Sequence, residues 1–247
     1  MKDYLQDIVL HTHGLGFIDL VKIEGSDEAT TLEGLAEDRS VIVKATFKNT
    51  VAEFMGTFGM PNLNKLDLLL KIPVYKDNAK LELLRQERNG TEVPVGIHFE
   101  NDGGDFKNDY RFMTSEIINE KLKSVKFKGV EWDVTFEPTK AKVSELTQVA
   151  GIYGGIEPNF TVKTENGNLI VTVGAADGSF TGKRTFAQNV DGELNEGYAW
   201  PLAQVLSILK LGMSGACVMQ ISKRGALQIS VDSGIGQYNY ILPALTV

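Results

Sequence analysis

The chain has 247 residues, of which 43% are hydrophobic and 23% are charged, a composition typical of globular proteins. This length allows one large domain or two domains of about 120 residues each. The formal net charge is −7 and the isoelectric point is near 5.1, which excludes a surface that is basic throughout. Any contact with nucleic acid would therefore need a local group of Lys and Arg side chains.

The cysteine content and the N-terminal segment indicate the cellular setting. Cys217 is the only cysteine, so no internal disulfide can form, and we expect it to be a small buried hydrophobic residue in a reducing, intracellular protein. Residues 1–14 include Asp3 and Asp7 and lack a continuous apolar stretch, unlike a signal peptide. No apolar run approaches the length of a membrane span. We expect a soluble protein of the cytoplasm, or of the host-cell cytoplasm if the protein is viral.

In the N-terminal half, residues 3–12 and residues 62–72 carry apolar side chains at helical spacing. Alternating apolar and polar residues follow each segment and predict β-strands. The expected strands are residues 17–23, 40–47, 80–86, 95–101 and 105–113. The acidic stretches 24–39 and 101–105 are expected to be solvated loops, and the second contains the turn signal Asp102-Gly103-Gly104.

The C-terminal half repeats the same order of elements. Apolar residues at helical spacing run from Val143 to Tyr153 and from Leu202 to Leu209. Each predicted helix is followed by a β-hairpin, one turning at residues 166–167 (Asn-Gly) and the other at residues 224–225 (Arg-Gly). The pattern of a helix followed by strands recurs at about sixty residues, which indicates an internal repeat.

Pairing these helix-plus-strand segments predicts two similar α+β domains. We expect an N-terminal domain of residues 1–116 and a C-terminal domain of residues 132–247. Residues 117–131 are rich in Lys and poor in turn signals, so we expect an extended linker rather than a flexible one.

No stretch predicts a catalytic centre. Residues 212–216 (GMSGA) approach the G-x-S-x-G nucleophile motif, but they follow a predicted helix instead of a strand, and no His comes after Ser214. A glycine turn that ends the helix explains them better. Gly14 and Gly16 precede a predicted strand, whereas a dinucleotide-binding loop follows one. Since no carboxylate stands out as a general acid or base, we expect neither enzyme activity nor a cofactor.

The histidines are too few to predict a metal site. His11 and His13 could offer two imidazoles to a metal ion, but His98, the third histidine, lies in a predicted strand with no cysteine nearby. So incomplete a set of ligands argues against a metal site.

The order of elements resembles the sliding-clamp family, the processivity factors of DNA polymerases. The resemblance is carried by residues 132–151 (WDVTFEPTKAKVSELTQVAG), 197–212 (GYAWPLAQVLSILKLG) and 237–244 (QYNYILPA). The last stretch is similar to the clamp ending Tyr-Tyr-Leu-Ala-Pro, with Pro243 one position earlier. The closest likeness is to the replication clamps of large tailed bacteriophages, and a more distant one is to the eukaryotic proliferating cell nuclear antigen.

This resemblance implies the DNA clamp fold, in which three copies of a two-domain chain close a ring. Helices would line the central hole and antiparallel sheets would face outward. The implied protein has no catalytic activity, no cofactor and no membrane partner. It encircles duplex DNA without reading its sequence, tethers the replicative DNA polymerase, and is placed on DNA by an ATP-driven clamp loader.

The resemblance also implies roles for three sets of residues, each with an alternative that the sequence leaves open. Phosphate contacts inside the ring would come from Lys2, Lys65, Lys71, Lys140, Lys142 and Lys210. The alternative is that these lysines solvate ordinary helix surfaces. The edges of neighbouring subunits would be residues 108–114 and 183–189, with Tyr110, Phe112, Arg184 and Phe186 at the interface. Here the alternative is that Phe112 and Phe186 are core aromatic residues.

A pocket for partner peptides is implied at the C-terminal strand and the linker. Its residues would be Val41, Val43, Val125, Phe127, Tyr240, Ile241, Leu242, Pro243 and Ala244. The alternative is that Tyr240 and Leu242 alternate into the core, which explains Pro243 less well. An exposed apolar patch of this kind usually marks a protein-binding site.

Two other functions remain possible from the sequence. The protein could be a non-catalytic, β-rich scaffold that binds other proteins, such as a virion or tail component, without forming a ring. It could also be a hydrolase that uses the acidic loops, although no arrangement of residues identifies its acid or base.

Overall fold

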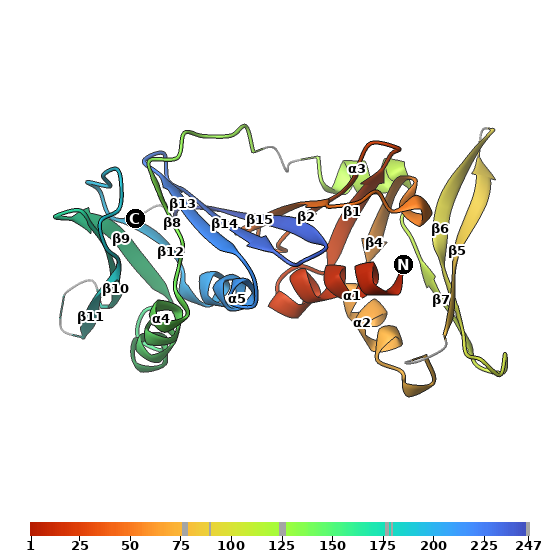
Figure 1. Ribbon diagram of the computed structural model, residues 1–247, viewed down its shortest axis with the longest axis horizontal. Helices are drawn as coiled ribbons and strands as arrows, with labels where there is room; N and C mark the ends of the chain where they lie inside the picture. Colours follow the sequence, from red (N-terminus) through yellow and green to blue (C-terminus); the bar gives the residue numbers. More distant parts are fainter. Residues whose placement is uncertain (76–78, 89, 124–126, 176–177, 179, 246–247) are drawn as a thin grey trace. The chain divides into compact units, whose positions relative to one another are not determined.

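A computed structural model describes residues 1–75, 79–88, 90–123, 127–175, 178 and 180–245, drawn in Figure 1. The chain divides into two compact units. Unit 1 comprises Met1–Lys126 and Ile235–Tyr238, and unit 2 comprises Phe127–Gly234 and Asn239–Val247. Both units combine α-helices with antiparallel sheets, so the predicted α+β class is confirmed.

The elements alternate along the chain between helices and groups of strands. Up to residue 121 they are α1 (Lys2–His11), η1 (His13–Leu15), β1 (Leu20–Gly25), β2 (Thr30–Leu35), β3 (Ile42–Phe47), η2 (Ala52–Phe54), β4 (Gly56–Pro61), α2 (Leu63–Leu70), η3 (Pro73–Tyr75), β5 (Lys80–Arg88), β6 (Thr91–Glu100), β7 (Lys107–Arg111) and α3 (Ser115–Lys121). Beyond it they are β8 (Val134–Phe136), α4 (Lys140–Tyr153), β9 (Asn159–Glu165), β10 (Asn168–Gly174), β11 (Thr181–Ala187), β12 (Tyr198–Pro201), α5 (Leu202–Gly212), β13 (Cys217–Ser222), β14 (Ala226–Asp232) and β15 (Gly236–Pro243).

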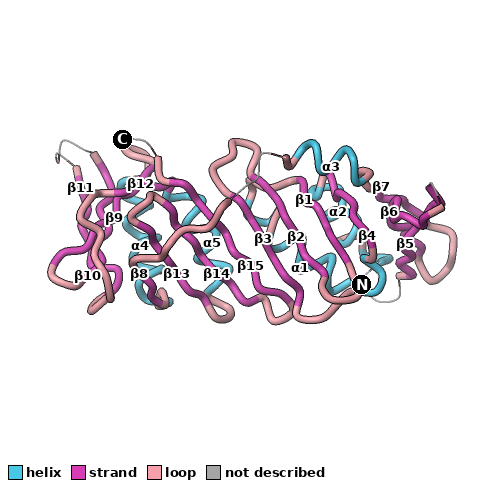
Figure 2. Tube along the Cα trace, turned by 90° about the horizontal axis from the view of Figure 1, so that it is seen from above, coloured by secondary structure: helices cyan, strands magenta, loops and turns pink. Residues whose placement is uncertain are grey.

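Unit 1 contains two antiparallel arrays of strands. Strands β4, β1, β2 and β3 lie side by side in that order, as Figure 2 shows, and β5, β6 and β7 form a separate three-stranded sheet. Helices α1 and α2 contact each other and bury apolar side chains in the core, among them Leu5, Ile8, Leu63 and Leu66.

Unit 2 repeats this arrangement. One array has the order β11-β10-β9-β12, and β14, β13 and β8 are neighbours in the other. The β9–β10 hairpin turns at Asn166 and Gly167, which both have positive φ angles (51° and 73°), as the Asn-Gly signal predicts. In the β13–β14 hairpin, Gly225 takes a φ of 74°. Both predicted hairpins are therefore confirmed.

Helix α4 illustrates why the helices form where the sequence places them. The Thr139 hydroxyl accepts a hydrogen bond from the Lys142 amide at 3.3 Å and caps the first turn. Val143, Leu146 and Val149 then recur on one buried face.

The structure differs from the sequence prediction in two segments of unit 1. Residues Ser115–Lys121 form α3, so the start of the expected extended linker is helical. Ile118 and Leu122 anchor it against an apolar cluster of Leu20, Leu35, Ile42 and Met113. Residues Thr30–Leu35, expected within a solvated acidic loop, form β2, because Thr30, Leu32 and Gly34 alternate into the core. Residues 101–105 form the turn that was expected.

Candidate functional site

An apolar groove lies between α2 and β7 of unit 1. Leu68, Leu69 and Ile72 line one side, Pro61 and Tyr110 line the other, and the groove has a volume of about 650 Å³. Leu68 is 58% exposed, although it is flanked by buried leucines on the same helix. An exposed apolar groove of this kind is a candidate protein-binding surface.

Tyr110 fixes the floor of this groove. Its ring is buried and its hydroxyl donates a hydrogen bond of 2.5 Å to the Pro61 carbonyl. Burial, with the Asp19 carboxylate as a smaller cause, raises the pKa of Tyr110 far above its usual value, so the hydroxyl remains a donor. The predicted interface residue Tyr110 thus lies at the groove, between the exposed side chains of Asp109 and Arg111.

A second apolar surface lies in unit 2, at the end of α4 and the start of β11. Ile152, Ile156 and Phe180 are 67%, 52% and 64% exposed. Helix α4 and β11 are closely packed, since a Cβ on Gly182 would come 2.7 Å from the Tyr153 ring. We name these three side chains the α4 patch. In the part of the chain that the structure describes, β7 and β11 are edge strands of their sheets, so the groove and the α4 patch each lie beside an unpaired strand edge.

The predicted interface aromatic residues occupy different positions. Phe112 is half-buried and stacks on Phe58 with ring centroids 4.3 Å apart. Phe186 is 4% exposed and packs edge-to-face against Phe136, so it is a core residue, as the alternative interpretation held. Arg184 is exposed on β11. The sequence did contain a signal for the groove, because Leu68 falls outside the buried stripe of α2.

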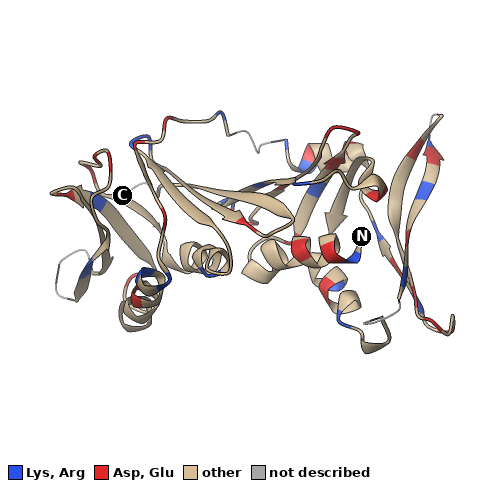
Figure 3. Cartoon of the chain, viewed as in Figure 1, with Lys and Arg blue, Asp and Glu red and all other residues tan. Residues whose placement is uncertain are grey.

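The predicted DNA-binding lysines divide into two groups. Three have partners in the structure: Lys2 donates to the Tyr75 carbonyl at 2.8 Å, Lys71 pairs with Asp67 at 2.6 Å, and Lys142 pairs with Glu145 at 2.9 Å. The other three, Lys65, Lys140 and Lys210, have exposed side chains. Figure 3 shows both basic and acidic residues on α1, α2 and α4, whereas the only charged residue of α5 is Lys210.

Most of the predicted partner pocket is buried. Val41 and Val43 are 0% exposed in the core of unit 1, which leaves them unavailable to a partner in this conformation. In unit 2, Tyr240, Ile241 and Leu242 are also buried. The burial of Tyr240 and Leu242 agrees with the alternative interpretation, whereas Ile241 between them is also buried, which an alternating strand does not explain.

The chain after Leu242 is the accessible part of this region. Trp200 Nε1 donates to the Leu242 carbonyl at 3.2 Å, while Pro243 and Leu245 are exposed. Leu245 is held by a hydrogen bond from its amide to the Ala199 carbonyl at 2.9 Å, and Ala244 is half-buried. Phe127 is half-buried and stacks on Trp132, whereas Val125 lies outside the described residues.

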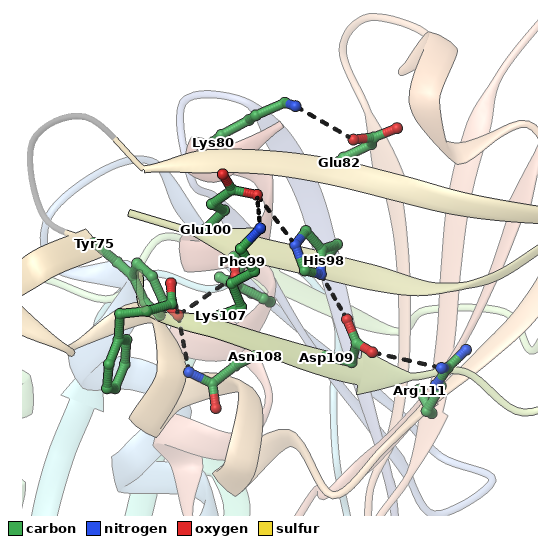
Figure 4. A network of polar contacts seen from close by, with 11 residues as sticks. Tyr75, Lys80, Glu82, His98, Phe99, Glu100, Lys107, Asn108, Asp109 and Arg111 are labelled. Carbon is green, nitrogen blue, oxygen red and sulfur yellow. Dashed lines mark hydrogen bonds and ion pairs between the residues drawn. The ribbon is translucent and has the colours of Figure 1, made fainter. Parts of the chain in front are cut away.

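The residues considered for catalysis or metal binding have structural partners. Ser214 donates to the Leu211 carbonyl at the end of α5. His11 is buried against Tyr238, His13 lies 3.4 Å from Asp19, and His98 lies between Asp109 and Glu100 (Figure 4). Among the residues that the structure describes, no cluster of three His, Cys, Asp or Glu side chains could hold a metal ion. Within the same residues, no helix is long and apolar enough to cross a membrane.

Comparison with known proteins supports the architecture. No protein-family model and no curated protein sequence matches the chain. Solved structures do match: PCNA from Thermococcus kodakaraensis (TM-score 0.68, 11% identity, 99% of this chain and 97% of that one), A. fulgidus PCNA bound to the C-terminal region of FEN-1 (0.68, 10%, 100% and 97%), and the proliferating cellular nuclear antigen of Entamoeba histolytica (0.64, 14%, 99% and 94%). The chain therefore has the fold of the PCNA sliding clamps, as predicted.

Proposed function

We propose that the protein is a sliding clamp that forms a ring of three copies, encircles duplex DNA and tethers a DNA polymerase. It acts without catalysis or a cofactor, and an ATP-driven loader opens the ring, because a closed ring cannot pass onto DNA that has no free end. The main support is that the fold matches PCNA structures over 99–100% of this chain and 94–97% of theirs. The proposed kinship with bacteriophage clamps rests on the order of elements in the sequence.

Ring closure is supported by two unlike surfaces on each chain. The groove beside β7 belongs to unit 1, and the α4 patch beside β11 belongs to unit 2. In a head-to-tail ring each copy places its α4 patch in the groove of the next, and the free edges of β7 and β11 pair. Such heterologous contacts remove exposed strand edges and apolar surface together.

Sequence-independent DNA binding is supported by the local charge of the helices. Helices α1, α2, α4 and α5, together with Lys71, carry six Lys and four acidic residues, whereas the whole chain has a net charge of −7. A weakly positive lining would attract phosphates without reading bases. The exposed Lys65, Lys140 and Lys210 are the strongest candidates for phosphate contacts.

Partner binding is supported by the exposed end of β15 and the residues that follow it. A. fulgidus PCNA was solved with the C-terminal region of FEN-1 bound, so a related clamp binds a terminal segment of another protein. In this chain, Pro243 and Leu245 are exposed, Ala244 is half-buried, and Phe127 of the segment between α3 and β8 is half-buried. We propose that they contact the polymerase and the loader.

Two linked measurements test the proposal. Light scattering across a dilution series should give three times the chain mass of 27.1 kDa, and the loaded protein should stay on circular DNA but leave linear DNA through its ends. A protein that remains a monomer and gains no retention on circular DNA in the presence of a loader would favour the non-ring scaffold.

A further inference from the structure

In the internal repeat, most of the long helices are preceded by a short strand. Helices α2, α4 and α5 each follow a short strand: β4, β8 and β12 respectively. We name β4, β8 and β12 the pre-helix strands. They pair antiparallel with β1, β13 and β9 respectively. Each pre-helix strand therefore pairs with the strand that follows the other helix of the same unit.

The fourth position of this pattern has no strand among the described residues. By the same rule, a strand leading into α1 would pair with β5, the strand after α2. Helix α1 begins at Lys2, and no described residue before it forms a strand. The three-stranded sheet has the order β5-β6-β7, so the outer edge of β5 is unpaired in the part of the chain that the structure describes.

The core beneath β5 is correspondingly less well covered. Leu81 and Leu83 pair across the sheet with Phe99 and Ile97, which are 0% exposed, so both leucines face the core side. Even so, both are only half-buried. The equivalent residues on β1, β9 and β13, which pair with the pre-helix strands, are at most 1% exposed: Val21, Ile23, Phe160, Val162, Met219 and Ile221. A further strand beside β5 would cover this remaining apolar surface.

The free edge has a defined length. A bulge interrupts the β5–β6 register between Leu84 and Arg85, and the Arg85 guanidinium donates to the carbonyls of Glu53 and Met55. Before the bulge, Lys80 and Glu82 form an ion pair at 3.7 Å on the opposite face of the sheet from the leucines (Figure 4). The regular stretch is therefore residues 80–84, comparable in length to β8 and β12.

We propose that residues 80–84 bind an extended peptide segment of another protein by antiparallel strand addition. The peptide would carry apolar or β-branched side chains at alternate positions, as the Val-Thr-Phe of β8 does, and these would cover Leu81 and Leu83. A second copy of this chain fits less well, because full antiparallel overlap of two such stretches places Glu82 opposite Glu82. The proposal concerns a different surface from the ring contacts and stands without them.

The probe is a fluorescent peptide of residues 131–138 (EWDVTFEP). It contains β8, the pre-helix strand of α4, which is equivalent to the strand that α1 lacks among the described residues. Anisotropy measured with the full-length protein should show saturable binding, and hydrogen exchange should slow at the amides of residues 80–84. The control peptide carries Val134→Ser and Phe136→Ser, which keep the length and charge but remove the apolar contacts. We expect its affinity to be lower by about tenfold or more.

A protein variant tests whether the peptide uses this edge. Inserting residues 132–139 (WDVTFEPT) between Met1 and Lys2 provides a strand at the spacing that β8 has from α4. This variant should protect the β5 amides and lose peptide binding by about tenfold or more, whereas an insert with both Ser substitutions should do neither. The proposal is overturned if the native peptide does not bind, if the variant binds it equally well, or if β5 amides are protected only by a doubling of mass.

Discussion

The Ile118 side chain lies directly over Gly59, where an added Cβ would come 2.9 Å from the Ile118 Cβ. This contact joins α3 to β4 and lies beside the apolar cluster that receives Ile118 and Leu122. Real Cβ atoms do not approach so closely, and the facing atoms belong to a branched, fully buried side chain. The position of α3 therefore depends on the absence of a side chain at residue 59.

Replacing this glycine should detach or displace α3. We expect Gly59→Ala to lower the free energy of unfolding by about 1–3 kcal/mol through overpacking, measured by urea denaturation. Gly151→Ala is the matched control, because a Cβ there meets nothing within 4 Å. It lies in α4 and should be neutral or gain up to about 1 kcal/mol. Equal effects of the two changes would show that the Ile118 contact does not constrain the fold.

The groove between α2 and β7 predicts a mutation that separates assembly from folding. Leu68→Asp puts a charge on an exposed groove residue, so the proposed ring should dissociate while the free energy of unfolding of the chain changes by no more than about 0.5 kcal/mol. Light scattering and thermal unfolding measure the two effects. Val74→Asp is the control, since Val74 is 51% exposed outside the groove. If the mass of the Leu68→Asp assembly equalled that of the native assembly, the proposed interface would be contradicted.

The exposed helix lysines predict the salt dependence of DNA association. Reversing Lys65, Lys140 and Lys210 to Glu should weaken loading on DNA and flatten the dependence of log K on log salt by about 0.9 for each phosphate that is no longer neutralised. The matched control reverses the charges of Lys121, Lys123 and Lys128, which are exposed and lie outside α1, α2, α4 and α5. If both triple variants had the same salt slope, the helices would not be the DNA-facing surface.

The proposed function predicts that a polymerase docks on the residues after Leu242. Pro243→Ser and Leu245→Ser together should reduce stimulation of the polymerase and leave the free energy of unfolding within about 0.5 kcal/mol, because both side chains are exposed. Leu242→Ala provides the contrast. Because Leu242 is buried, this change should lower the free energy of unfolding of the protein by about 2–5 kcal/mol, measured by denaturation. Unchanged stimulation by the double variant would place partner docking elsewhere.

Asp133 predicts part of the acid sensitivity of unit 2. Its carboxylate accepts a hydrogen bond from the Lys223 amide at 2.7 Å, and this bond, with the nearby Lys223 charge, holds the pKa of Asp133 below its usual value. Because the folded pKa is depressed, the carboxylate stabilises the fold above its unfolded pKa, and that stability is lost as the pH falls through the folded pKa. Asp133→Asn should therefore be less stable than the native protein near neutral pH.

The difference between Asp133→Asn and the native protein should narrow as the pH is lowered through that range, in urea unfolding at a series of pH values. Asp191→Asn, at an exposed carboxylate, is the control and should show no such convergence. A constant difference at every pH would mean that the charge of Asp133 does not contribute.

The sequence predicted elements formed by local patterns more accurately than surfaces formed by packing. Helix α4 and the Asn166-Gly167 turn depend on residues close together in the chain, and both were located correctly. The helix α3 was missed, because Ile118 and Leu122 are apolar residues in a Lys-rich segment whose partners lie elsewhere in unit 1. For the same reason, the burial of Val41 and Val43 depends on sheets and helices whose packing no local pattern reveals.

The start of β15 affects the order in which the protein can be completed during synthesis. Residues 235–238 belong to unit 1, where Tyr238 stacks on His11 and donates a hydrogen bond to Asp7, 231 positions earlier in the chain. The Lys48 amide likewise donates to the Ile235 carbonyl. On a ribosome, residues 1–126 emerge long before these partners exist. The face of α1 that carries Asp7 and His11 therefore stays uncovered by β15 until residues 235–238 have been synthesised.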